Sequence, residues 1–154
     1  MADIEKIHVK LGISGTYWRK KPAYRVLFND QVIKEAVVTG ECDQVEFVEF
    51  DTEYTTDSAT LKVQLLNKED SDTVQSALES SIVKDMLLNI VSLEIDEIDL
   101  GQIIYEDSEY LTDYQVDYNG GFTTSIKNCV NLGWNGTWLL TWNNPFYIWL
   151  LEKI

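Results

Sequence analysis

Ile7-His8-Val9-Lys10-Leu11-Gly12-Ile13 is the stretch of this sequence that decides the fold. Its apolar residues alternate with polar or small ones. Because successive side chains of a β-strand point to opposite sides, a period of two predicts a strand with one buried and one exposed face. We expect the chain to open with such a half-buried strand, which ends at Ser14-Gly15.

Further runs of strand character follow along the chain at intervals of roughly ten residues. They are Tyr24–Phe28, Val32–Val38, Val45–Phe50, Thr60–Leu65, Leu87–Val91, Leu93–Leu100, Thr137–Trp142 and Phe146–Leu151. Turn residues at Asn29-Asp30-Gln31 and Asn143-Asn144-Pro145 predict two hairpins, the second at the C-terminus. Strands do not alternate with helices, which argues against a parallel α/β sheet. We predict an all-β fold, a jelly-roll-like antiparallel β-sandwich.

Two polar segments separate these runs. Asn67–Ser81 and the tyrosine-rich Tyr105–Gly121 are expected to be long acidic surface loops, and a short helical turn at Val74–Leu78 would be the only helix. The chain has 154 residues, enough for one hydrophobic core, and no linker composition interrupts it. We expect residues 1–154 to form a single β-sandwich domain.

The net charge limits the partners. The chain carries 26 acidic and 12 basic residues, a net charge of −14, which repels nucleic acid and anionic membrane surfaces. The longest apolar run is too short to span a bilayer, so no membrane insertion is expected. Met1–Glu5 lacks the basic and apolar regions of a signal peptide, which predicts synthesis in a cytoplasm. Cys42 and Cys129 are then expected to be free, buried thiols.

The sequence shows no catalytic machinery. His8 lies in mid-strand without a nucleophile or orienting acid in any known motif, and we expect it to face solvent. Phosphate-binding and dinucleotide-binding glycine motifs are missing. Pairs of carboxylates such as Asp96 and Asp99, which glycoside hydrolysis requires, are neighbours in sequence only. We therefore predict a protein that is not an enzyme.

Acidic residues gather in one region. Between Asp85 and Ile126 the chain has ten acidic residues and neither lysine nor arginine. Their mutual repulsion would be relieved by a hard cation such as calcium, which takes six to eight oxygen ligands. A solvated acidic face that keeps the protein soluble is the alternative interpretation.

Aromatic residues gather near the C-terminus. On strands, Trp138 and Trp142 would share one face and Tyr147 and Trp149 another. Such residues fill a core, anchor a subunit interface or stack against sugar rings. Because both faces of the last strand are apolar, we favour a core or an interface over an open sugar-binding surface. We predict these four residues at an interface. Trp18, with Tyr17 in the first loop, is the candidate for an exposed glycan contact.

One part of the chain resembles a known family. The segments Leu61–Asn67 and Asp85–Asp96, with the polar loop between them, look like the second half of the calcium-dependent, xylan-binding type of carbohydrate-binding module. The resemblance covers about the first two thirds of the chain. It implies a β-sandwich in which aspartates ligate calcium and the ion binds sugar hydroxyls directly.

The resemblance also suggests calcium ligands. Asp85 matches the family's closing aspartate, but Lys68 follows Asn67 where the family has aspartate, and Met86-Leu87 replaces arginine and asparagine. Asp70 or Asp72 would have to substitute for the missing ligand. The candidate calcium ligands are therefore Asp85, Asp70 and Asp72.

The C-terminal third is similar to a different group of proteins. Asn128–Trp138 and Pro145–Glu152 are similar to the C-terminal region of small proteins of tailed bacteriophages. This similarity implies a non-enzymatic structural protein of the virion, a capsid decoration or a tail or fibre component. It would form homo-oligomers, assemble with other virion proteins and meet host glycans. The alternative hypothesis is a free-standing calcium-dependent glycan-binding module.

Overall fold

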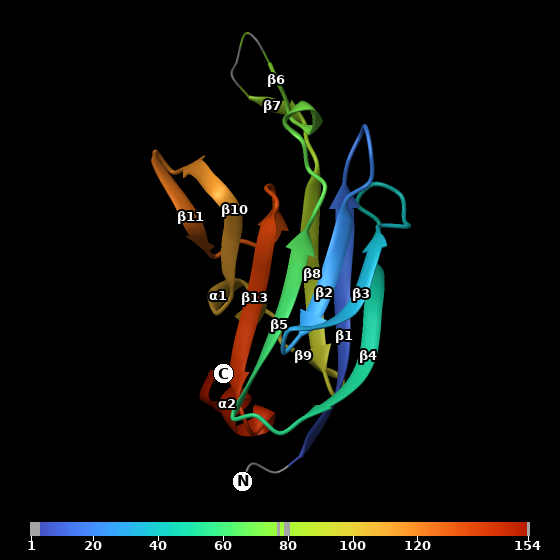
Figure 1. The fold of residues 1–154 in the computed structure, drawn as a ribbon, viewed down its shortest axis with the longest axis vertical. Helices are drawn as coiled ribbons and strands as arrows, with labels where there is room; N and C mark the ends of the chain where they lie inside the picture. Colours follow the sequence, from blue (N-terminus) through green and yellow to red (C-terminus); the bar gives the residue numbers. More distant parts are fainter. Residues whose placement is uncertain (1–3, 77, 79–80, 154) are drawn as a thin grey trace.

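Two antiparallel β-sheets pack face to face in the computed structural model, which describes residues 4–76, 78 and 81–153 (Figure 1). The first sheet has the strand order β12-β8-β1-β4, with β9 paired to β8. Its strands are β1 (Glu5–Thr16), β4 (Glu46–Tyr54), β8 (Leu87–Ile95), β9 (Ile98–Asp99) and β12 (Asn131–Leu132). The predicted all-β antiparallel sandwich is confirmed.

The second sheet is the larger one, with the order β11-β10-β13-β5-β2-β3. Its strands are β2 (Ala23–Phe28), β3 (Gln31–Val37), β5 (Ser58–Leu65), β10 (Glu109–Tyr118), β11 (Gly121–Lys127) and β13 (Gly136–Asn143). A small pair, β6 (Val74–Gln75) with β7 (Ile82–Lys84), projects from one end of the sandwich (Figure 1). The helical segments are the 3-10 turn η1 (Asp70–Asp72), α1 (Ile103–Glu106) and α2 (Phe146–Lys153).

The core lies between the two sheets and follows the alternation in the sequence. In β1 the apolar residues Ile7, Val9 and Leu11 are buried, and the polar residues between them lie on the outer face. In β5, Leu61 and Val63 point into the same core from the opposite sheet. Burying each such side chain contributes about 1.5–3 kcal/mol, so the pattern is sufficient to fix which face of each strand turns inward. Unlike our expectation, β1 does not end at Ser14-Gly15 but continues to Thr16.

The predicted C-terminal hairpin is wrong. Residues after Pro145 form the helix α2 instead of a strand. Phe146, Trp149 and Leu150 are buried, and their spacing of three and four residues is that of one helical face. The helix closes the end of the sandwich opposite β6 and β7 (Figure 1).

The predicted loop over Tyr105–Gly121 is also wrong. Most of it is strand β10, which pairs with both β11 and β13. The turn after it contains Asn119 and Gly120 with positive φ of 54° and 83°, a conformation that these two residue types favour in hairpins. In the other polar segment, Val74 and Gln75 form β6, not the expected helical turn; Ala77 lies outside the described residues.

Candidate functional site

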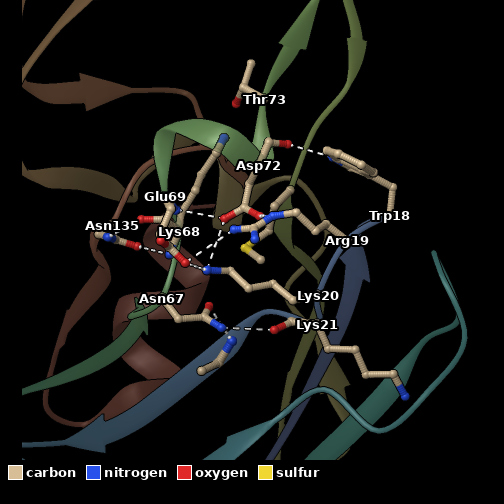
Figure 2. A network of polar contacts seen from close by, with 12 residues as sticks. Trp18, Arg19, Lys20, Lys21, Asn67, Lys68, Glu69, Asp72, Thr73 and Asn135 are labelled. Carbon is tan, nitrogen blue, oxygen red and sulfur yellow. Dashed lines mark hydrogen bonds and ion pairs between the residues drawn. The ribbon is translucent and has the colours of Figure 1, made fainter.

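Three loops meet at the end of the sandwich from which β6 and β7 project, and we call their meeting point the corner site. They are the β1–β2 loop (residues 17–22), the segment Asn67–Thr73 that contains η1, and the turn Gly133–Asn135 before β13. Figure 2 shows basic side chains of the first loop reaching the acidic residues of the second. The corner thus joins segments from both sheets.

The turn η1 is built around the carboxylate of Asp72. The backbone N–H of Glu69 donates to Asp72 Oδ2 at 2.8 Å, and the backbone N–H of Asp72 donates to the carbonyl oxygen of Glu69 at 3.0 Å. An acceptor at this place satisfies a backbone donor that the short helix itself cannot pair. The acidic segment after Asn67 therefore folds back on itself and presents Asp70 to solvent.

Asp72 is fully buried and paired with two cations. Arg19 Nε donates to Asp72 Oδ1 at 2.9 Å, and Lys20 Nζ lies 3.3 Å from Oδ2 (Figure 2). Burial alone would raise the pKa of Asp72, but the hydrogen bond from the Glu69 backbone and the two cations outweigh it and lower that pKa below its ordinary value. The carboxylate therefore stays ionised inside the corner.

The same cations hold Glu69. Lys20 Nζ makes a close ion pair with Glu69 Oε1, and Arg19 Nη2 lies 3.3 Å from the same oxygen. The hydrogen bond from Lys20 is the main cause of a lowered pKa of Glu69. Two basic and two acidic side chains thus form one network that ties the β1–β2 loop to η1.

Lys68 makes a second ionic contact in the corner. Its Nζ donates to Asp85 Oδ1 at 2.6 Å and to the carbonyl oxygen of Gly133 at 2.5 Å. The side-chain amide of Asn135 holds the Lys68 backbone. Its Oδ1 accepts from the Lys68 N–H at 2.8 Å, and its Nδ2 donates to the Lys68 carbonyl oxygen at 3.0 Å. Thr73 Oγ1 also donates to Asp85 Oδ1 at 2.7 Å, so η1, β8 and the last turn are joined.

Beside this network lies a small cavity of about 100 Å³. Its lining residues are charged, hydroxyl-bearing and aromatic ones: Lys68, Glu69, Asp70, Thr73, Gly133, Tyr114 and Trp134. Tyr110, buried below it, holds the backbone of Trp134, because its hydroxyl accepts from the Trp134 N–H at 2.9 Å and donates to the Trp134 carbonyl oxygen. Aromatic side chains and a few polar groups are the kinds of residue with which proteins contact small polar ligands.

The three predicted calcium ligands do not form an ion site. Asp72 faces Arg19 and Lys20, and Asp85 faces Lys68, so both carboxylates are occupied by cations of the chain. Among residues 4–76, 78 and 81–153, no group of three or more histidine, cysteine, aspartate or glutamate side chains is placed to hold a metal ion. The residues present therefore do not fit calcium.

The predicted glycan contacts, Tyr17 and Trp18, lie in the β1–β2 loop at the edge of the corner. Trp18 is 43% exposed; its Nε1 donates to the carbonyl oxygen of Asp72 at 2.9 Å, and Lys84 Nζ lies 4.8 Å from its ring centroid. Tyr17 is half-buried, and its hydroxyl donates to the carbonyl oxygen of Gly40. Trp18 is thus exposed, as expected, but one end of its indole is fixed against η1. A glycan contact by either residue stays a prediction.

The predicted interface residues lie in different surroundings. Trp138 and Trp142 are 0% and 1% exposed, because they point between the two sheets, and Trp149 is buried where α2 packs on this core. These three tryptophans are core residues, and the prediction of an interface is wrong for them. Tyr147 is exposed, and its hydroxyl donates to Asp96 Oδ2 at 2.7 Å. Cys129 is half-buried and Cys42 exposed, and both are free thiols.

A larger groove of about 480 Å³ lies on the outer face of the first sheet around His8. Its lining residues are Lys6, Ile7, His8, Asp51, Thr52, Glu53 and Asp96. The imidazole nitrogens of His8 face Asp51 Oδ1 at 2.8 Å and Glu49 Oε2 at 3.3 Å, and the hydrogen bond with Asp51 is the main cause of a raised pKa of His8. As expected, His8 lies on the outer face. The residues that line the groove include carboxylates but no tyrosine or tryptophan, although the Tyr147 hydroxyl donates to the lining residue Asp96. The corner, whose cavity is lined by Tyr114 and Trp134, is therefore the better candidate site.

The corner residues that sequence reasoning missed are Arg19, Lys20, Lys68, Tyr114 and Trp134. One signal was available: Arg19-Lys20-Lys21 is a run of three basic residues in a chain with few of them, directly after Trp18. A basic run in an acidic protein indicates pairing with an acidic segment, and Glu69–Asp72 is that segment. Tyr114 could not be found because its surroundings had been assigned to a loop.

Comparisons with known proteins show the fold. No protein-family model matches the chain, and no curated protein matches it in sequence. Among solved structures, a module described as "vCBM60 in complex with galactobiose" superposes with a TM-score of 0.53 and 10% identity, over 86% of this chain and 96% of that chain. A selenomethionine form of vCBM60 gives a TM-score of 0.53 and 10% identity, over 87% of this chain and 89% of that chain.

The second of these structures is described as linking two families of calcium-dependent carbohydrate-binding modules by circular permutation. At 10% identity the likeness shows the fold alone. Within the described residues, no helix has the length and apolarity needed to cross a membrane. The chain therefore has the β-sandwich fold of a carbohydrate-binding module.

Proposed function

We propose that this protein is a non-catalytic domain that binds a glycan at the corner site. The observation that carries the proposal is the cavity lined by two aromatic residues, Tyr114 and Trp134, together with Asp70, Thr73 and Lys68. A sugar residue has an apolar face of C–H groups and a rim of hydroxyls. Aromatic rings pack against the apolar C–H face, and charged or hydroxyl groups hydrogen-bond to the sugar hydroxyls.

The preorganisation of the cavity supports the proposal. Tyr110 holds the Trp134 backbone through both its N–H and its carbonyl oxygen, and the backbone N–H of Asp113 donates to the Asn135 carbonyl oxygen at 2.9 Å. The wall that carries Trp134 is therefore fixed to β10 before any ligand arrives. A fixed site loses little conformational entropy on binding, which favours affinity for a small ligand.

The fold neighbours indicate which ligands to test first. One of them is described as holding galactobiose, and both are carbohydrate-binding modules. Short galactose-containing oligosaccharides therefore come first, and short xylan fragments second, because the resemblance in the sequence is to xylan-binding modules. Each oligosaccharide is tested with and without calcium. The proposal does not require the ion, because Asp72 and Asp85 are paired with basic side chains of the chain itself.

The experiment is isothermal titration calorimetry of the protein with these oligosaccharides. We expect Trp134→Ala and Tyr114→Ala each to weaken binding at least tenfold. Phe122→Ala is the matched control, because Phe122 is an aromatic residue 75% exposed on β11 and does not line the cavity; it should leave binding unchanged. Binding that is equally strong in all three variants would place the glycan elsewhere, and binding of no glycan would refute the function.

A place in a bacteriophage particle, with several copies assembled on other virion proteins, stays a prediction from the C-terminal sequence. Of the four residues predicted to carry such assembly, only Tyr147 is exposed. Light scattering of the purified protein tests the oligomer separately from glycan binding.

A further inference from the structure

The ammonium group of Lys68 is nearly enclosed by the protein. The Lys68 side chain is 9% exposed and that of its partner Asp85 is 18% exposed. A charge removed from water to this extent is costly unless oxygen atoms replace its hydration. The oxygen atoms that replace hydration around Lys68 Nζ are Asp85 Oδ1, at 2.6 Å, and the Gly133 carbonyl oxygen, at 2.5 Å.

The two oxygen atoms that contact the ammonium group are of kinds that also bind metal ions. A carboxylate and a backbone carbonyl are common calcium ligands, with calcium–oxygen distances of about 2.3–2.6 Å. Asp85 Oδ1 also accepts hydrogen bonds from Thr73 Oγ1 and from the Met86 backbone N–H, at 2.7 and 2.8 Å. Because the lysine ammonium already neutralises this carboxylate, a metal ion would have to displace it and would be repelled by it.

The carboxylate of Asp72, which is fully buried, is neutralised in the same way. Asp72 accepts from Arg19 Nε at 2.9 Å and lies beside Lys20 Nζ at 3.3 Å. Asp72 and Asp85, two of the three acids predicted to bind calcium, thus each have a basic partner from another segment of the chain. The third, Asp70, is exposed on η1.

We infer that Lys68 supplies from within the chain the positive charge that a metal ion supplies in calcium-dependent modules, so that the corner folds without calcium. This inference departs from the description of the fold neighbours and does not depend on whether a glycan binds. It also predicts that removing the ammonium group leaves an unpaired carboxylate among oxygen atoms, a place that calcium can then occupy.

The test is thermal unfolding of the wild type, Lys68→Met and Lys68→Met/Asp85→Asn, each with millimolar calcium chloride and with a chelator. The wild type should melt at the same temperature in both. Lys68→Met keeps an unbranched side chain but loses the charge, so its melting temperature should fall by roughly 5–10 °C in chelator. Calcium should restore at least half of that loss.

Two further proteins make the result specific. The double variant has neither charge, so it should melt above Lys68→Met in chelator and show no response to calcium. Lys62→Met removes a lysine that pairs with the exposed Asp30, and it should respond to calcium no more than the wild type.

A wild-type melting temperature that rises with calcium would overturn the inference. So would a Lys68→Met variant that is as stable as the wild type, or one that is destabilised but unaffected by calcium. None of these melts contains a glycan, so their outcome is separate from the fate of the glycan proposal.

Discussion

Asp72 shows how a single residue organises the corner. In the described part of the chain it is the one charged residue that is fully buried. Its side chain connects Arg19 of the β1–β2 loop and the Glu69 backbone with η1. Burial alone would raise the pKa of this carboxylate, but a backbone N–H and two cations outweigh burial and lower that pKa below its ordinary value. The corner therefore depends on charges that complement one another, and substitutions should show this.

Asp72→Asn should lower the free energy of unfolding by about 2–4 kcal/mol, because it leaves Arg19 and Lys20 without their buried partner. Chemical denaturation measures the change. Asp51→Asn is the control, since Asp51 is an exposed carboxylate on the outer face and its loss should cost less than about 1 kcal/mol. Equal effects of the two substitutions would show that the Asp72 network contributes nothing special.

The same residue predicts the acid sensitivity of the protein. Because the pKa of Asp72 is lower in the folded than in the unfolded protein, its stabilisation is present above about pH 4 and is lost as the pH falls through the folded value. Wild-type stability should therefore decline between about pH 5 and pH 2 more steeply than that of Asp72→Asn, as denaturation at several pH values would show. Parallel curves would contradict this assignment.

His8 is the only histidine, so its titration can be followed directly by NMR. Its pKa is raised, chiefly by the hydrogen bond with Asp51, and should lie above the usual value of about 6.5. The stabilisation from this contact is present below about pH 6.5 and is lost as the pH rises through the folded pKa. Asp51→Asn should lower the pKa of His8, whereas Asp30→Asn should not. A His8 pKa below 6.5 in the wild type would be the contrary result.

At the scale of elements, the pairing of β10 with β13 positions the wall of the corner. Gly136 lies opposite Thr112 in this pairing, and a Cβ at Gly136 would lie 2.3 Å from the Leu111 carbonyl oxygen and 2.8 Å from Thr112 Cα. Both are backbone atoms that cannot move without separating the strands. Only glycine allows β10 to approach closely enough to place Tyr110 under Trp134.

Gly136→Ala should therefore lower the free energy of unfolding by about 2–3 kcal/mol, through overpacking against backbone. Gly121→Ala is the matched control, because Gly121 is also in a strand of this sheet but has no atom within 4 Å of the position a Cβ would take. It should change stability by less than about 0.5 kcal/mol. A mild Gly136→Ala variant would mean that the two strands are not held this closely.

Elements were predictable from the sequence where one face of a strand is apolar and the other polar. This was so for β1, whose buried residues alternate from Ile7 to Leu11, and for β5, where they alternate from Ala59 to Leu65. The prediction from alternation failed for β10, because acidic residues on its outer face hide the alternation of Tyr110, Thr112 and Val116. The turn pair Asn119-Gly120 after β10 is the signal that indicates a hairpin there. The prediction failed for α2 because a short, wholly apolar run fits a strand as well as a helix.

The candidate site was less predictable than the fold, because it is made by long-range pairing of charges. Asp85 and Asp72 were recognised as special, but a list of acids does not tell which basic residues will meet them. Lys68 and Asp85 are brought together by the connection between β5 and β8, and Arg19 reaches Asp72 from a distant loop. Only the fold supplies these partners, and with them the interpretation changes from metal ligands to ion pairs.

At the scale of the whole molecule, charge is distributed unevenly. The chain has 12 basic residues against 26 acidic ones, yet Arg19, Lys20, Lys21, Lys68 and Lys84 all lie in or beside the corner. The rest of the surface is strongly acidic, which favours solubility and disfavours nucleic acid. The molecule is thus a two-sheet sandwich with one mixed-charge end that carries aromatic residues, and this is where we propose that a neutral, hydroxyl-rich ligand binds.

The most direct test of glycan binding at the corner is an NMR titration of the isotope-labelled protein with galactobiose and with short xylan fragments, in the presence of a chelator. Saturable shifts should appear for the Trp134 indole N–H and for the backbone amides of residues 68–73 and 113–115, while the amides of β3 and β4 stay unchanged. Shifts confined to the outer face around His8, or no shifts with any glycan, would contradict the account.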